Sequence, residues 1–445
     1  MTMNDDFSIQ TVHTVHMIGI GGIGMSALAR MFLVRGVRVS GSDLSESVIT
    51  HALAEKGAVI GIGQAAVNIP EHVDIIVYSP AIVPGNLEYD EAIRRGVPMF
   101  SYPETLGLVS RGMRTIAVSG THGKTTTTAM IAHILVKEGK SPTVIAGSLM
   151  NAMPAYGIDE RTNFIPGESD IFVVEACEYK RSFLNVSPNI LVITNIEEDH
   201  LDYYKDIDDI LDAFRTLVGK TGQMGTVIAD MSLPYISRAL EGFDGEVVDT
   251  RDIVGDISLV VPGAHNVGNA RAAVAAARAV GVSEAAARAA LVDFSGTWRR
   301  SEYKGVLVSG ATVYDDYAHH PTEIRATLAG FRERFPGKNI TVLFQPHLYS
   351  RTREFLEAFA HAFIDADNVI ITDIYAARER DDGTVHARDL VLAMGSVHPR
   401  ATYGGPLNMI VENLMATHAL SSDDILITMG AGDVYRIGER LLEQA

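Results

Sequence analysis

The chain has 445 residues, of which 47% are hydrophobic, and Asp and Glu outnumber Lys and Arg by 55 to 37. Because a single hydrophobic core stops growing near roughly 250 to 300 residues, this length predicts two or three domains. The formal net charge of -18 disfavours binding to nucleic acid or to an anionic membrane, since both would repel an acidic surface. An anionic substrate would therefore need a local cationic site.

The cysteine content and the start of the chain indicate a reducing cytoplasm. Cys177 is the only cysteine, which excludes an internal disulfide, and "MTMNDDFSIQ" lacks the basic and apolar regions of a signal peptide. The most apolar window, "VHMIGIGGIGMSALARMFLV", is rich in glycine and contains Arg30, so it suits a strand, turn and helix better than a membrane span. We expect a cytoplasmic monomer or homodimer that acts on small molecules, without a nucleic acid or membrane partner.

Apolar strands alternate with amphipathic segments of helix length, which predicts an α/β fold with parallel strands. The first series has expected strands at 15–20, 37–43, 73–80 and 97–101. The second has strands at 114–120, 170–176, 189–195 and 225–230, followed by an alanine-rich helix at 266–281. The third has strands at 311–318, 339–347, 368–375 and 423–432. We therefore predict three domains: a Rossmann-like N-terminal domain (1–112), a P-loop central domain (113–297) and a Rossmann-like C-terminal domain (298–445).

Gly19, Gly21 and Gly24 form the pattern G-x-G-x-x-G between the first expected strand and the following helix. Glycines let the backbone approach a diphosphate at the helix N-terminus, and Asp43, at the end of the next strand, could accept a hydrogen bond from a ribose hydroxyl. This context favours a nucleotide diphosphate site. The alternative is a tight structural turn.

The stretch "VSGTHGKTTTTAM" (118–130) resembles a phosphate-binding loop that has been shortened. The common P-loop is G-x-x-x-x-G-K-[ST], whereas here Gly120 lies only three residues before Gly123. Backbone N–H groups of such a loop bind phosphates, Lys124 would reach the outer phosphates, and the Thr125 hydroxyl would hold magnesium. We expect Lys124 to lie on a solvent-facing loop. The alternative is a glycine-rich turn with a chance lysine.

Charged residues follow two later strands of the second series. The first cluster contains Glu175, Glu178, Lys180 and Arg181, and the second contains Asn195, Asp199, His200 and Asp202. Ligands of open α/β sheets bind outside the carboxyl ends of the strands, and magnesium prefers oxygen ligands, so Glu175 is a better candidate than His200. Each residue taken singly could instead be a solvated loop residue.

The third series also carries polar groups at its strand ends. They are Asp315, Tyr317, His319, His320, His347, Tyr349, Arg351 and Arg353. So many polar and aromatic groups at one expected sheet edge indicate a site rather than packing alone. Just before this series, His265, Asn266 and Asn269 lie at the start of a helix, where His265 or Asn266 could simply cap it.

These motifs together resemble those of the Mur ligase family, and in particular its alanine-adding branch, over essentially the whole length. The family's loop G-T-x-G-K-[ST]-[ST] matches "GTHGKTT". Further matches occur in order as "IGIGGIGMS", "TNIEEDHLD", "GAHNVGNARAA", "FSGTWRRSE", "DDYAHHPTEI", "QPHLYSRT" and "TDIYAARE". The resemblance implies ATP-dependent joining of L-alanine to the carboxylate of UDP-N-acetylmuramate through an acyl phosphate, a step of peptidoglycan synthesis that serves cell shape and division.

The resemblance also implies where the ligands bind and which residues hold them. The first domain would hold the UDP part of the substrate rather than NAD, ATP would lie between the second and third domains, and the third domain would help to bind the amino acid. The implied UDP-substrate residues are Gly19, Gly21, Gly22, Gly24, Asp43 and Ser79. The implied ATP residues are Gly120, Thr121, His122, Gly123, Lys124, Thr125, Thr126, Asn195, His265, Asn269, Arg300 and Asp315, with Asp315 on the ribose. Thr125, Glu175 and His200 would bind Mg2+, and Tyr317, His319, His347 and Arg351 would surround the alanine, with Lys124, His319 and Arg351 as catalytic residues.

Two departures from the branch concern the charge of the site. Where the branch has E-A-D-E-S-D, this chain has "EACEYKRSF", and where the branch often has an arginine after Q-P-H, this chain has Leu348. Lys180 or Arg181 could replace the absent positive charge. No counterpart of the carbamylated lysine of other Mur ligases is evident, as expected for this branch. The alternatives are the related ligase that recycles tripeptide onto UDP-N-acetylmuramate, an NAD-dependent oxidoreductase and a non-enzymatic nucleotide sensor.

Overall fold

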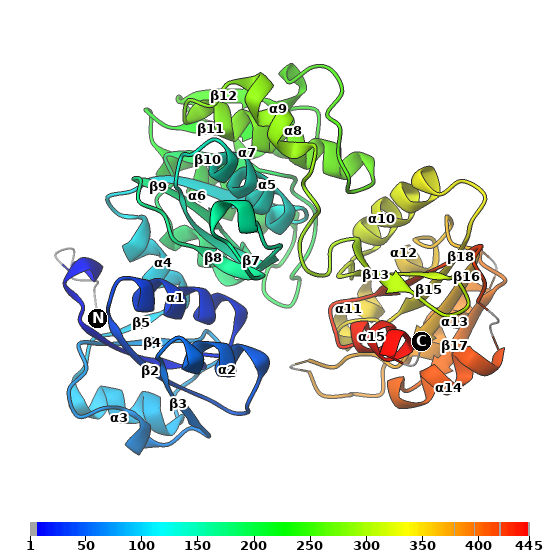
Figure 1. Cartoon of the computed structure of the whole chain (residues 1–445), viewed down its shortest axis with the longest axis horizontal. Coiled ribbons are helices and arrows are strands. Elements are labelled where there is room, and N and C mark those ends of the chain that lie inside the picture. Colours follow the sequence, from blue (N-terminus) through cyan, green and yellow to red (C-terminus); the bar gives the residue numbers. More distant parts are fainter. Residues whose placement is uncertain (1–6, 378, 396, 418–419, 444–445) are drawn as a thin grey trace. The chain divides into compact units, whose positions relative to one another are not determined.

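The computed structural model describes residues 7–377, 379–395, 397–417 and 420–443 (Figure 1). Residues 1–6, part of the stretch from which we excluded a signal peptide, lie outside these ranges. The described residues form three sheets, and the predicted three-domain α/β fold is confirmed. Contacts group the chain into two compact units, Met1–Ser258 with Gly268–Asp293 and Leu259–Val267 with Phe294–Ala445. In the described ranges, no helix combines the length and apolar character needed to cross a membrane.

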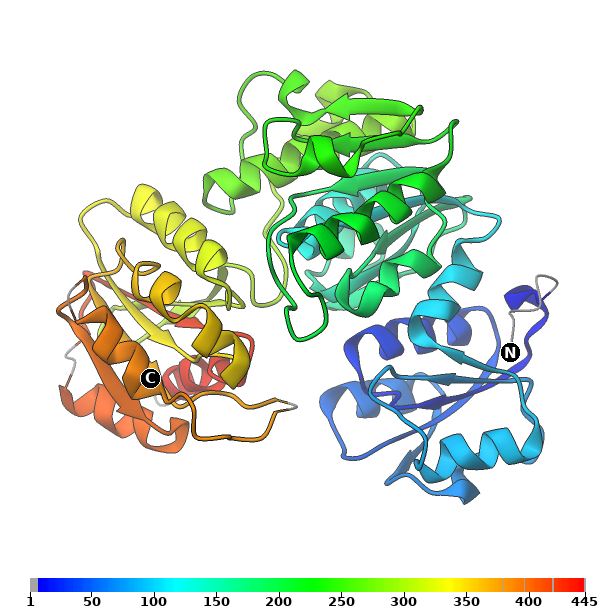
Figure 2. The same cartoon turned by 180° about the vertical axis from the view of Figure 1, so that it is seen from behind.

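The first sheet has five parallel strands in the order β3-β2-β1-β4-β5, which is the Rossmann-like order. The strands are β1 (Thr14–Ile18), β2 (Arg38–Asp43), β3 (Val59–Ile62), β4 (Ile75–Tyr78) and β5 (Met99–Ser101), and the helices are α1 (Ile23–Val34), α2 (Val48–Glu55), α3 (Leu87–Arg95) and α4 (Tyr102–Ser110). Alternation along the strands fills both faces: Met17 and Val77 pack with α1, whereas Ile18 and Ile76 pack with Ala92 of α3. Helices α1 and α3 accordingly cover opposite faces of this sheet (Figures 1 and 2).

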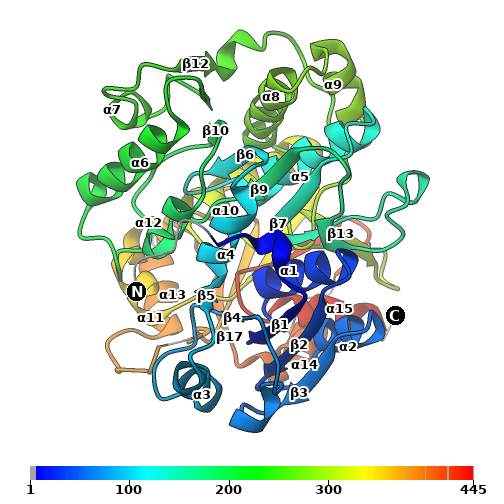
Figure 3. The ribbon, with the colours of Figure 1, turned by 90° about the vertical axis from the view of Figure 1, so that its left-hand side faces the viewer.

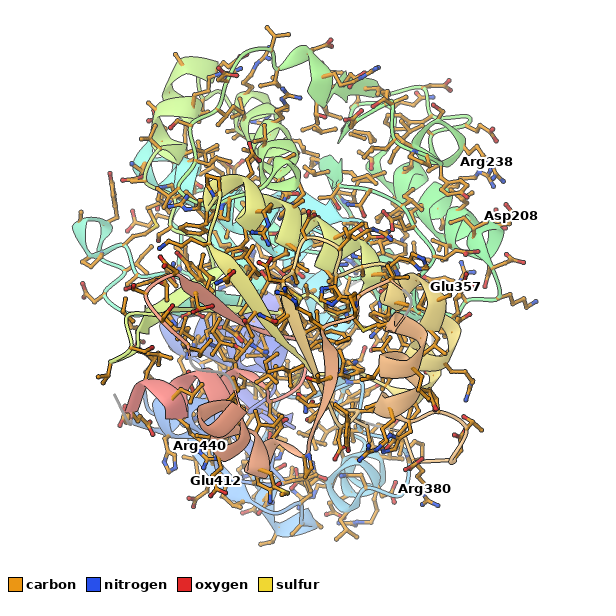
Figure 4. The ribbon with its side chains drawn as sticks, turned by 90° about the vertical axis from the view of Figure 1, so that its right-hand side faces the viewer. Asp208, Arg238, Glu357, Arg380, Glu412 and Arg440 are labelled. Atoms are coloured by element: carbon orange, nitrogen blue, oxygen red, sulfur yellow. The ribbon has the colours of Figure 1, made fainter. Side chains whose placement is uncertain are left out.

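The second sheet has the order β12-β11-β10-β6-β9-β7-β8, and only the β7–β8 pair of this sheet is antiparallel. Its strands are β6 (Arg114–Ser119), β7 (Thr143–Met150), β8 (Thr162–Ile165), β9 (Ile171–Glu175), β10 (Ile190–Ile193), β11 (Thr226–Ala229) and β12 (Glu246–Asp249). Its helices are α5 (Lys124–Lys137), α6 (Ile207–Thr221), α7 (Ile236–Ala239), α8 (Ala264–Ala279) and α9 (Glu284–Leu291). Helices α5 and α6 cover opposite faces (Figure 3). On α6, the exposed Asp208 pairs with Arg238 of α7 at 2.6 Å (Figure 4).

The third sheet belongs to the second unit and has the order β13-β14-β18-β15-β16-β17, with an antiparallel β13–β14 pair at one edge. The strands are β13 (Glu302–Val306), β14 (Thr312–Asp316), β15 (Asn339–Phe344), β16 (Asn368–Thr372), β17 (Ala401–Gly405) and β18 (Asp424–Met429). The helices are α10 (Pro321–Arg334), α11 (Tyr349–Glu354), α12 (Leu356–Ala360), α13 (Ala387–Met394), α14 (Leu407–Thr417) and α15 (Tyr435–Glu443). The sequence prediction missed both antiparallel edge pairs, because β8 and β13 are short and carry no clear alternation.

Helix α1 joins the first two sheets into one unit. Asn163 of β8 donates from Nδ2 to the carbonyl of Ile23 at 2.5 Å and to the hydroxyl of Ser26 at 3.0 Å. One turn further along, the Arg30 guanidinium donates to the Thr162 hydroxyl at 3.0 Å. Buried apolar residues of both sheets belong to one continuous core. The first two sheets therefore share their hydrophobic interior.

A buried carboxylate ties the strands of the first sheet together. Glu88 of α3 is 0% exposed, and its Oε2 lies 3.0 Å from Nε2 of His16 and accepts from the Ser42 hydroxyl at 2.6 Å. Its Oε1 accepts from Nδ2 of Asn68 at 2.6 Å and from the N–H of Ala65 at 3.0 Å. Burial raises the pKa of the Glu88 carboxyl, but the hydrogen bonds from its neighbours outweigh that effect and lower it. The carboxylate thus links α3 to β1, β2 and the loop after β3.

Replacing Glu88 by alanine should destabilise this sheet, because four hydrogen-bond partners would lose their acceptor inside the core. Removing one partner of a buried pair costs about 3–5 kcal/mol. Arg94→Ala, at a 71% exposed side chain on the same helix, should have a much smaller effect. Native-state hydrogen exchange of the β1 and β2 amides measures both effects. Equal protection in the two variants would contradict a stabilising role for the Glu88 network.

Candidate active site

The loop between β6 and α5 adopts a conformation that only glycine accommodates easily. The φ angle is 132° at Gly120 and 82° at Gly123, both in the left-handed region. A Cβ on Gly120 would also lie 2.1 Å from the Thr194 hydroxyl, and one on Gly123 would lie 2.5 Å from Oδ1 of Asn269. The spacing of these glycines is therefore fixed by the backbone and by close packing.

The end of β10 braces this loop. The N–H of His122 donates to Oδ1 of Asn195 at 2.9 Å, and Nδ2 of Asn195 donates back to the His122 carbonyl at 3.1 Å. The N–H of Thr121 donates to the Asn195 carbonyl at 3.0 Å. The Thr194 hydroxyl, which the sequence reasoning missed, donates to the same His122 carbonyl at 2.5 Å. Asn195, expected near ATP, acts in this structure by holding the loop.

The side chain of Lys124, the first residue of α5, is partly buried. The side chain is 14% exposed, so the prediction of a solvent-facing lysine is wrong. Its Nζ donates to the carbonyls of Gly120 at 2.6 Å and Thr121 at 2.9 Å, and lies 3.1 Å from Oε1 and 3.0 Å from Oε2 of Glu178. Burial lowers the pKa of Lys124, but Glu178 and the neighbouring groups outweigh it and raise the pKa overall. The lysine therefore remains charged.

Thr125 and Glu175 lie side by side, as a shared magnesium site would require. The Thr125 hydroxyl donates to Oε1 of Glu175 at 3.0 Å, and the N–H of Gly147 donates to Oε2 at 2.8 Å. These are hard oxygen donors, which suit Mg2+. His200 contacts a different carboxylate: its Nε2 lies 3.4 Å from Oε1 of Glu178, while its buried Nδ1 has no hydrogen-bond partner among the described residues.

The segment after Glu178 departs from the family motif and holds unusual backbone. Lys180 and Arg181 have φ angles of 53° and 55°, although neither is glycine. Arg181 pairs with Asp209 at 2.5 Å and lies over the Tyr204 ring at 5.6 Å. The positive charge of Arg181 is therefore paired with Asp209 inside the first unit.

The glycines of the first sheet meet protein groups at close range. Gly21 donates its N–H to Oδ2 of Asp43 at 2.9 Å, and a Cβ there would lie 2.8 Å from the same oxygen. A Cβ on Gly19 (φ 81°) would lie 3.0 Å from Cβ of Ser79, and one on Gly24 would lie 2.5 Å from the Tyr102 ring. Gly22 is the N-cap of α1. The predicted UDP-substrate residues therefore gather at the carboxyl ends of β1, β2 and β4.

In the second unit, a buried arginine that the sequence reasoning missed organises the end of β14. The Arg299 side chain is 3% exposed, and its Nε donates to Oδ2 of Asp315 at 2.8 Å. Its two terminal nitrogens donate to the carbonyls of Gly432 at 2.7 Å and Gly430 at 2.6 Å. Oδ1 of Asp315 accepts from the Thr428 hydroxyl at 2.6 Å. Asp315, expected beside a ribose, is thus 1% exposed and engaged through both oxygens.

The residues expected around the amino acid lie together in the second unit. The His319 ring lies 5.3 Å from the Tyr317 ring and 5.8 Å from the His347 ring, centroid to centroid. Arg351, which is 7% exposed, donates to Nδ1 of His347 at 3.2 Å. The Arg300 guanidinium lies 5.0 Å from the centroid of Tyr317.

Two further residues of this cluster were not predicted. Oε2 of Glu323 lies 3.2 Å from Nδ1 of His319, and the ring of Tyr375 stacks on His347 at 5.7 Å. Both occur inside quoted motifs, "DDYAHHPTE" and "TDIYAARE", so their position after a strand was the available signal. They give the cluster a carboxylate and a second aromatic face.

His265, at the start of α8, is partly buried, and Leu348, after Q-P-H, is buried. Burial lowers the pKa of His265, an effect that Asp316 and Glu323 oppose, so the imidazole is neutral near pH 7. Leu348, which replaces the arginine after Q-P-H, is 3% exposed and has a φ angle of 69°. Its N–H donates to the Tyr375 carbonyl at 2.9 Å. An apolar side chain thus fills the position where the branch often has a charge.

Comparison with known families accounts for all three sheets. Residues 14–114 match the model "Mur ligase family, catalytic domain", residues 118–244 match "Mur ligase middle domain", and residues 299–432 match "Mur ligase, glutamate ligase domain". The chain belongs to the Mur ligase family.

The relatives of this Mur ligase cover nearly its whole length. It is 39% identical to a UDP-N-acetylmuramate--L-alanine ligase of Lachnospira eligens, over 96% of this chain and 98% of the relative. It is 40% identical to the protein of the same name from Alkaliphilus metalliredigens, over 97% of each chain.

Solved structures give the same grouping. A UDP-N-acetylmuramate-alanine ligase from Thermotoga maritima superposes with a TM-score of 0.78 at 29% identity, covering 97% of this chain and 98% of the other. A murein peptide ligase from Psychrobacter arcticus has a TM-score of 0.71 at 25% identity, with the same coverage. Both similarities extend over the whole Mur ligase fold.

The hydrogen bonds between Asn195 and His122 predict how substitution of Asn195 changes hydrogen exchange in the glycine loop. Asn195→Ala removes both side-chain hydrogen bonds to His122, each worth about 0.5–1.5 kcal/mol, so the His122 amide should exchange faster with solvent. Asn195→Asp keeps the acceptor for the His122 N–H but loses the donor to the carbonyl, and should give an intermediate exchange rate. Unchanged exchange of the His122 amide in Asn195→Ala would show that the Asn195 side chain does not hold the loop.

Proposed function

We propose that this Mur ligase joins L-alanine to the carboxylate of UDP-N-acetylmuramate at the expense of ATP, a step of peptidoglycan precursor synthesis in the cytoplasm. The observation that carries this proposal is the similarity, at 39–40% identity over at least 96% of the chain, to proteins named UDP-N-acetylmuramate--L-alanine ligase. The tripeptide-adding relative remains the second candidate, supported by the TM-score of 0.71 to a murein peptide ligase.

The proposed reaction has two steps. A carboxylate is a poor electrophile, so its oxygen first attacks the γ-phosphorus of ATP, which forms an acyl phosphate and releases ADP. The amine of alanine then attacks the acyl carbon, the C–O bond to phosphate breaks, and the amide, inorganic phosphate and a proton are released. The first step depends mainly on positioning and charge neutralisation. Lys124, with its ammonium at the glycine loop, is the proposed contact for the transferring phosphate.

Mg2+ is the proposed metal of this site. Thr125 and Glu175 would hold it, since their oxygens lie 3.0 Å apart. When bound, the ion would neutralise phosphate charge. We keep His200 as a third proposed ligand, because Nδ1 of its imidazole has no hydrogen-bond partner among the described residues.

The second unit would bind the amino acid. We propose that His319 orients the alanine amine and accepts its proton, with Glu323 at 3.2 Å holding the imidazole. Arg351 and Arg300 would supply positive charge for carboxylates, while Tyr317 and His347 would form the walls. Asp315 would act through Arg299 rather than on a ribose, because its oxygens are engaged by protein groups.

The remaining assignments follow the three sheets. We propose that residues 1–112 bind the UDP part of the substrate through the loop of Gly19, Gly21, Gly22 and Gly24, with Asp43 and Ser79 beside it. Residues 113–297 would bind ATP through the loop of Gly120 to Thr126, and residues 298–445 would bind the amino acid. His265, which is neutral, and Asn269 are proposed adenine contacts.

An acceptor panel tests the proposed function. Purified protein with ATP, Mg2+ and UDP-N-acetylmuramate is given L-alanine, glycine, L-serine or the tripeptide L-alanyl-γ-D-glutamyl-meso-diaminopimelate, and phosphate release and product mass are followed. We expect the highest kcat/KM with L-alanine. A higher value with the tripeptide would support the second candidate, and ATP binding without turnover would support a nucleotide sensor.

Neutralising the proposed metal carboxylate should raise the magnesium requirement. In Glu175→Gln the Mg2+ concentration for half-maximal rate should rise at least about tenfold, because even residues that only support metal ligands contribute that much to affinity. Glu198→Gln is the control. Glu198 is exposed in the loop after β10, and this substitution removes the same charge. An unchanged magnesium titration in Glu175→Gln would remove Glu175 from the site.

A further inference from the structure

Glu178 is a buried acid at the phosphate loop that the proposed reaction does not use. Its side chain is 5% exposed, and its two carboxylate oxygens lie 3.1 and 3.0 Å from Nζ of Lys124. On its other side, Oε1 lies 3.4 Å from Nε2 of His200. The carboxylate therefore stands between two side chains to which we assign contacts with ATP and metal.

Hydrogen bonds hold the backbone of Glu178 in place. Its carbonyl accepts from the Tyr204 hydroxyl at 2.6 Å and from the N–H of Arg181 at 2.9 Å, and Tyr204 is 1% exposed. Two and three residues further on, Lys180 and Arg181 have left-handed backbone, a conformation that costs free energy for residues other than glycine. These contacts fix the backbone position from which the Glu178 carboxylate reaches Lys124.

The carboxylate forms an ion pair with Lys124, since both of its oxygens lie within 3.1 Å of the ammonium nitrogen. The ammonium of Lys124 has three donors, and in the structure they face two loop carbonyls and Glu178. A phosphate that reaches Lys124 must therefore take the place of one of these acceptors, and Glu178 is the acceptor that carries a negative charge.

We propose that Glu178 is a positioning residue that holds Lys124 against the glycine loop and competes with nucleotide phosphates for its ammonium. This inference rests on the proposed function, in which Lys124 contacts the phosphates of ATP. The carboxylate keeps the lysine directed along the loop before ATP arrives. After phosphoryl transfer it takes back the ammonium, which weakens the hold on ADP and favours its release.

Glu178→Gln tests the competition, because glutamine has nearly the same shape but no charge. Isothermal titration of the full chain with ADP, without Mg2+ and with it, should show a dissociation constant about tenfold lower than in the unsubstituted protein, which corresponds to about 1.4 kcal/mol. Stopped-flow displacement should show slower ADP release. Glu198→Gln is the matched control, since it removes one exposed carboxylate from the same unit and should leave ADP affinity unchanged.

A substitution of Lys124 separates competition from general repulsion between the carboxylate and phosphate. In a Lys124→Met background the ammonium is absent, so Glu178→Gln should improve ADP affinity by less than it does in the unsubstituted background. An equal improvement in both backgrounds would overturn the competition. Glu178→Asp keeps the charge but withdraws it by one methylene, and should tighten ADP binding by about threefold. This variant decides the question if Glu178→Gln does not fold.

The other possible results of the ADP titrations are interpreted as follows. Unchanged or weaker ADP binding in folded Glu178→Gln would overturn the proposal, because a merely structural acid would give that result. Weaker binding only in the presence of Mg2+ would show that Glu178 is a metal ligand and would also overturn it. If the unsubstituted protein binds neither ADP nor ATP, the proposed function fails instead, which distinguishes the two failures.

Discussion

Parallel pairing of β6 with its neighbours β9 and β10 is the constraint on which the candidate active site depends. In this register Val118 lies opposite Glu175, and Ser119 lies opposite Ile193. All three strands therefore end at one edge of the sheet, where the glycine loop begins, where Glu175, the proposed magnesium ligand, stands, and where Asn195 can reach the loop backbone. A shift by one residue would turn the Glu175 side chain to the other face of the sheet.

Buried charges in this acidic chain are matched by local partners. Glu88 has His16, Glu178 has Lys124, and Asp315 has Arg299, each pair at about 3 Å. Such pairs add little net stability, because removing two charges from water costs about as much as their attraction returns. They do fix geometry, since a single mispaired charge in the interior is expensive.

The sequence predicted the features that depend on local pattern. The main strands and the helix at 266–281 were predicted from their own apolar patterns. The glycine loop and the cluster of Tyr317, His319, His347 and Arg351 were predicted because they follow apolar strands. Other features depend on partners distant in the chain. Glu178 meets Lys124 across 54 residues, and the environment of Asp315 depends on Arg299 and on glycine carbonyls more than 110 residues away. The pattern located these residues but not the groups that occupy their hydrogen bonds.

The glycines of the G-x-G-x-x-G pattern have two separate structural causes. Gly21 and Gly24 fit a nucleotide-binding motif, yet close contacts with Asp43 and Tyr102 already require a missing Cβ at both positions. The close packing of α1 therefore explains these glycines as well as a bound ligand would. The two causes are compatible, because the nucleotide-binding motif also needs glycine for close approach of the backbone to a diphosphate.

The contact between α1 and β8 affects how such ligases can exchange parts during evolution. Asn163 and Thr162 of β8 bind one face of α1, and apolar residues of both sheets form one interior. A chimera that took residues 1–112 from one relative and the rest from another would join two surfaces that had diverged separately. Recombination that also carries the hairpin of β7 and β8 would keep the matched surfaces together, so the exchangeable module is larger than the first sheet and is not continuous in the chain.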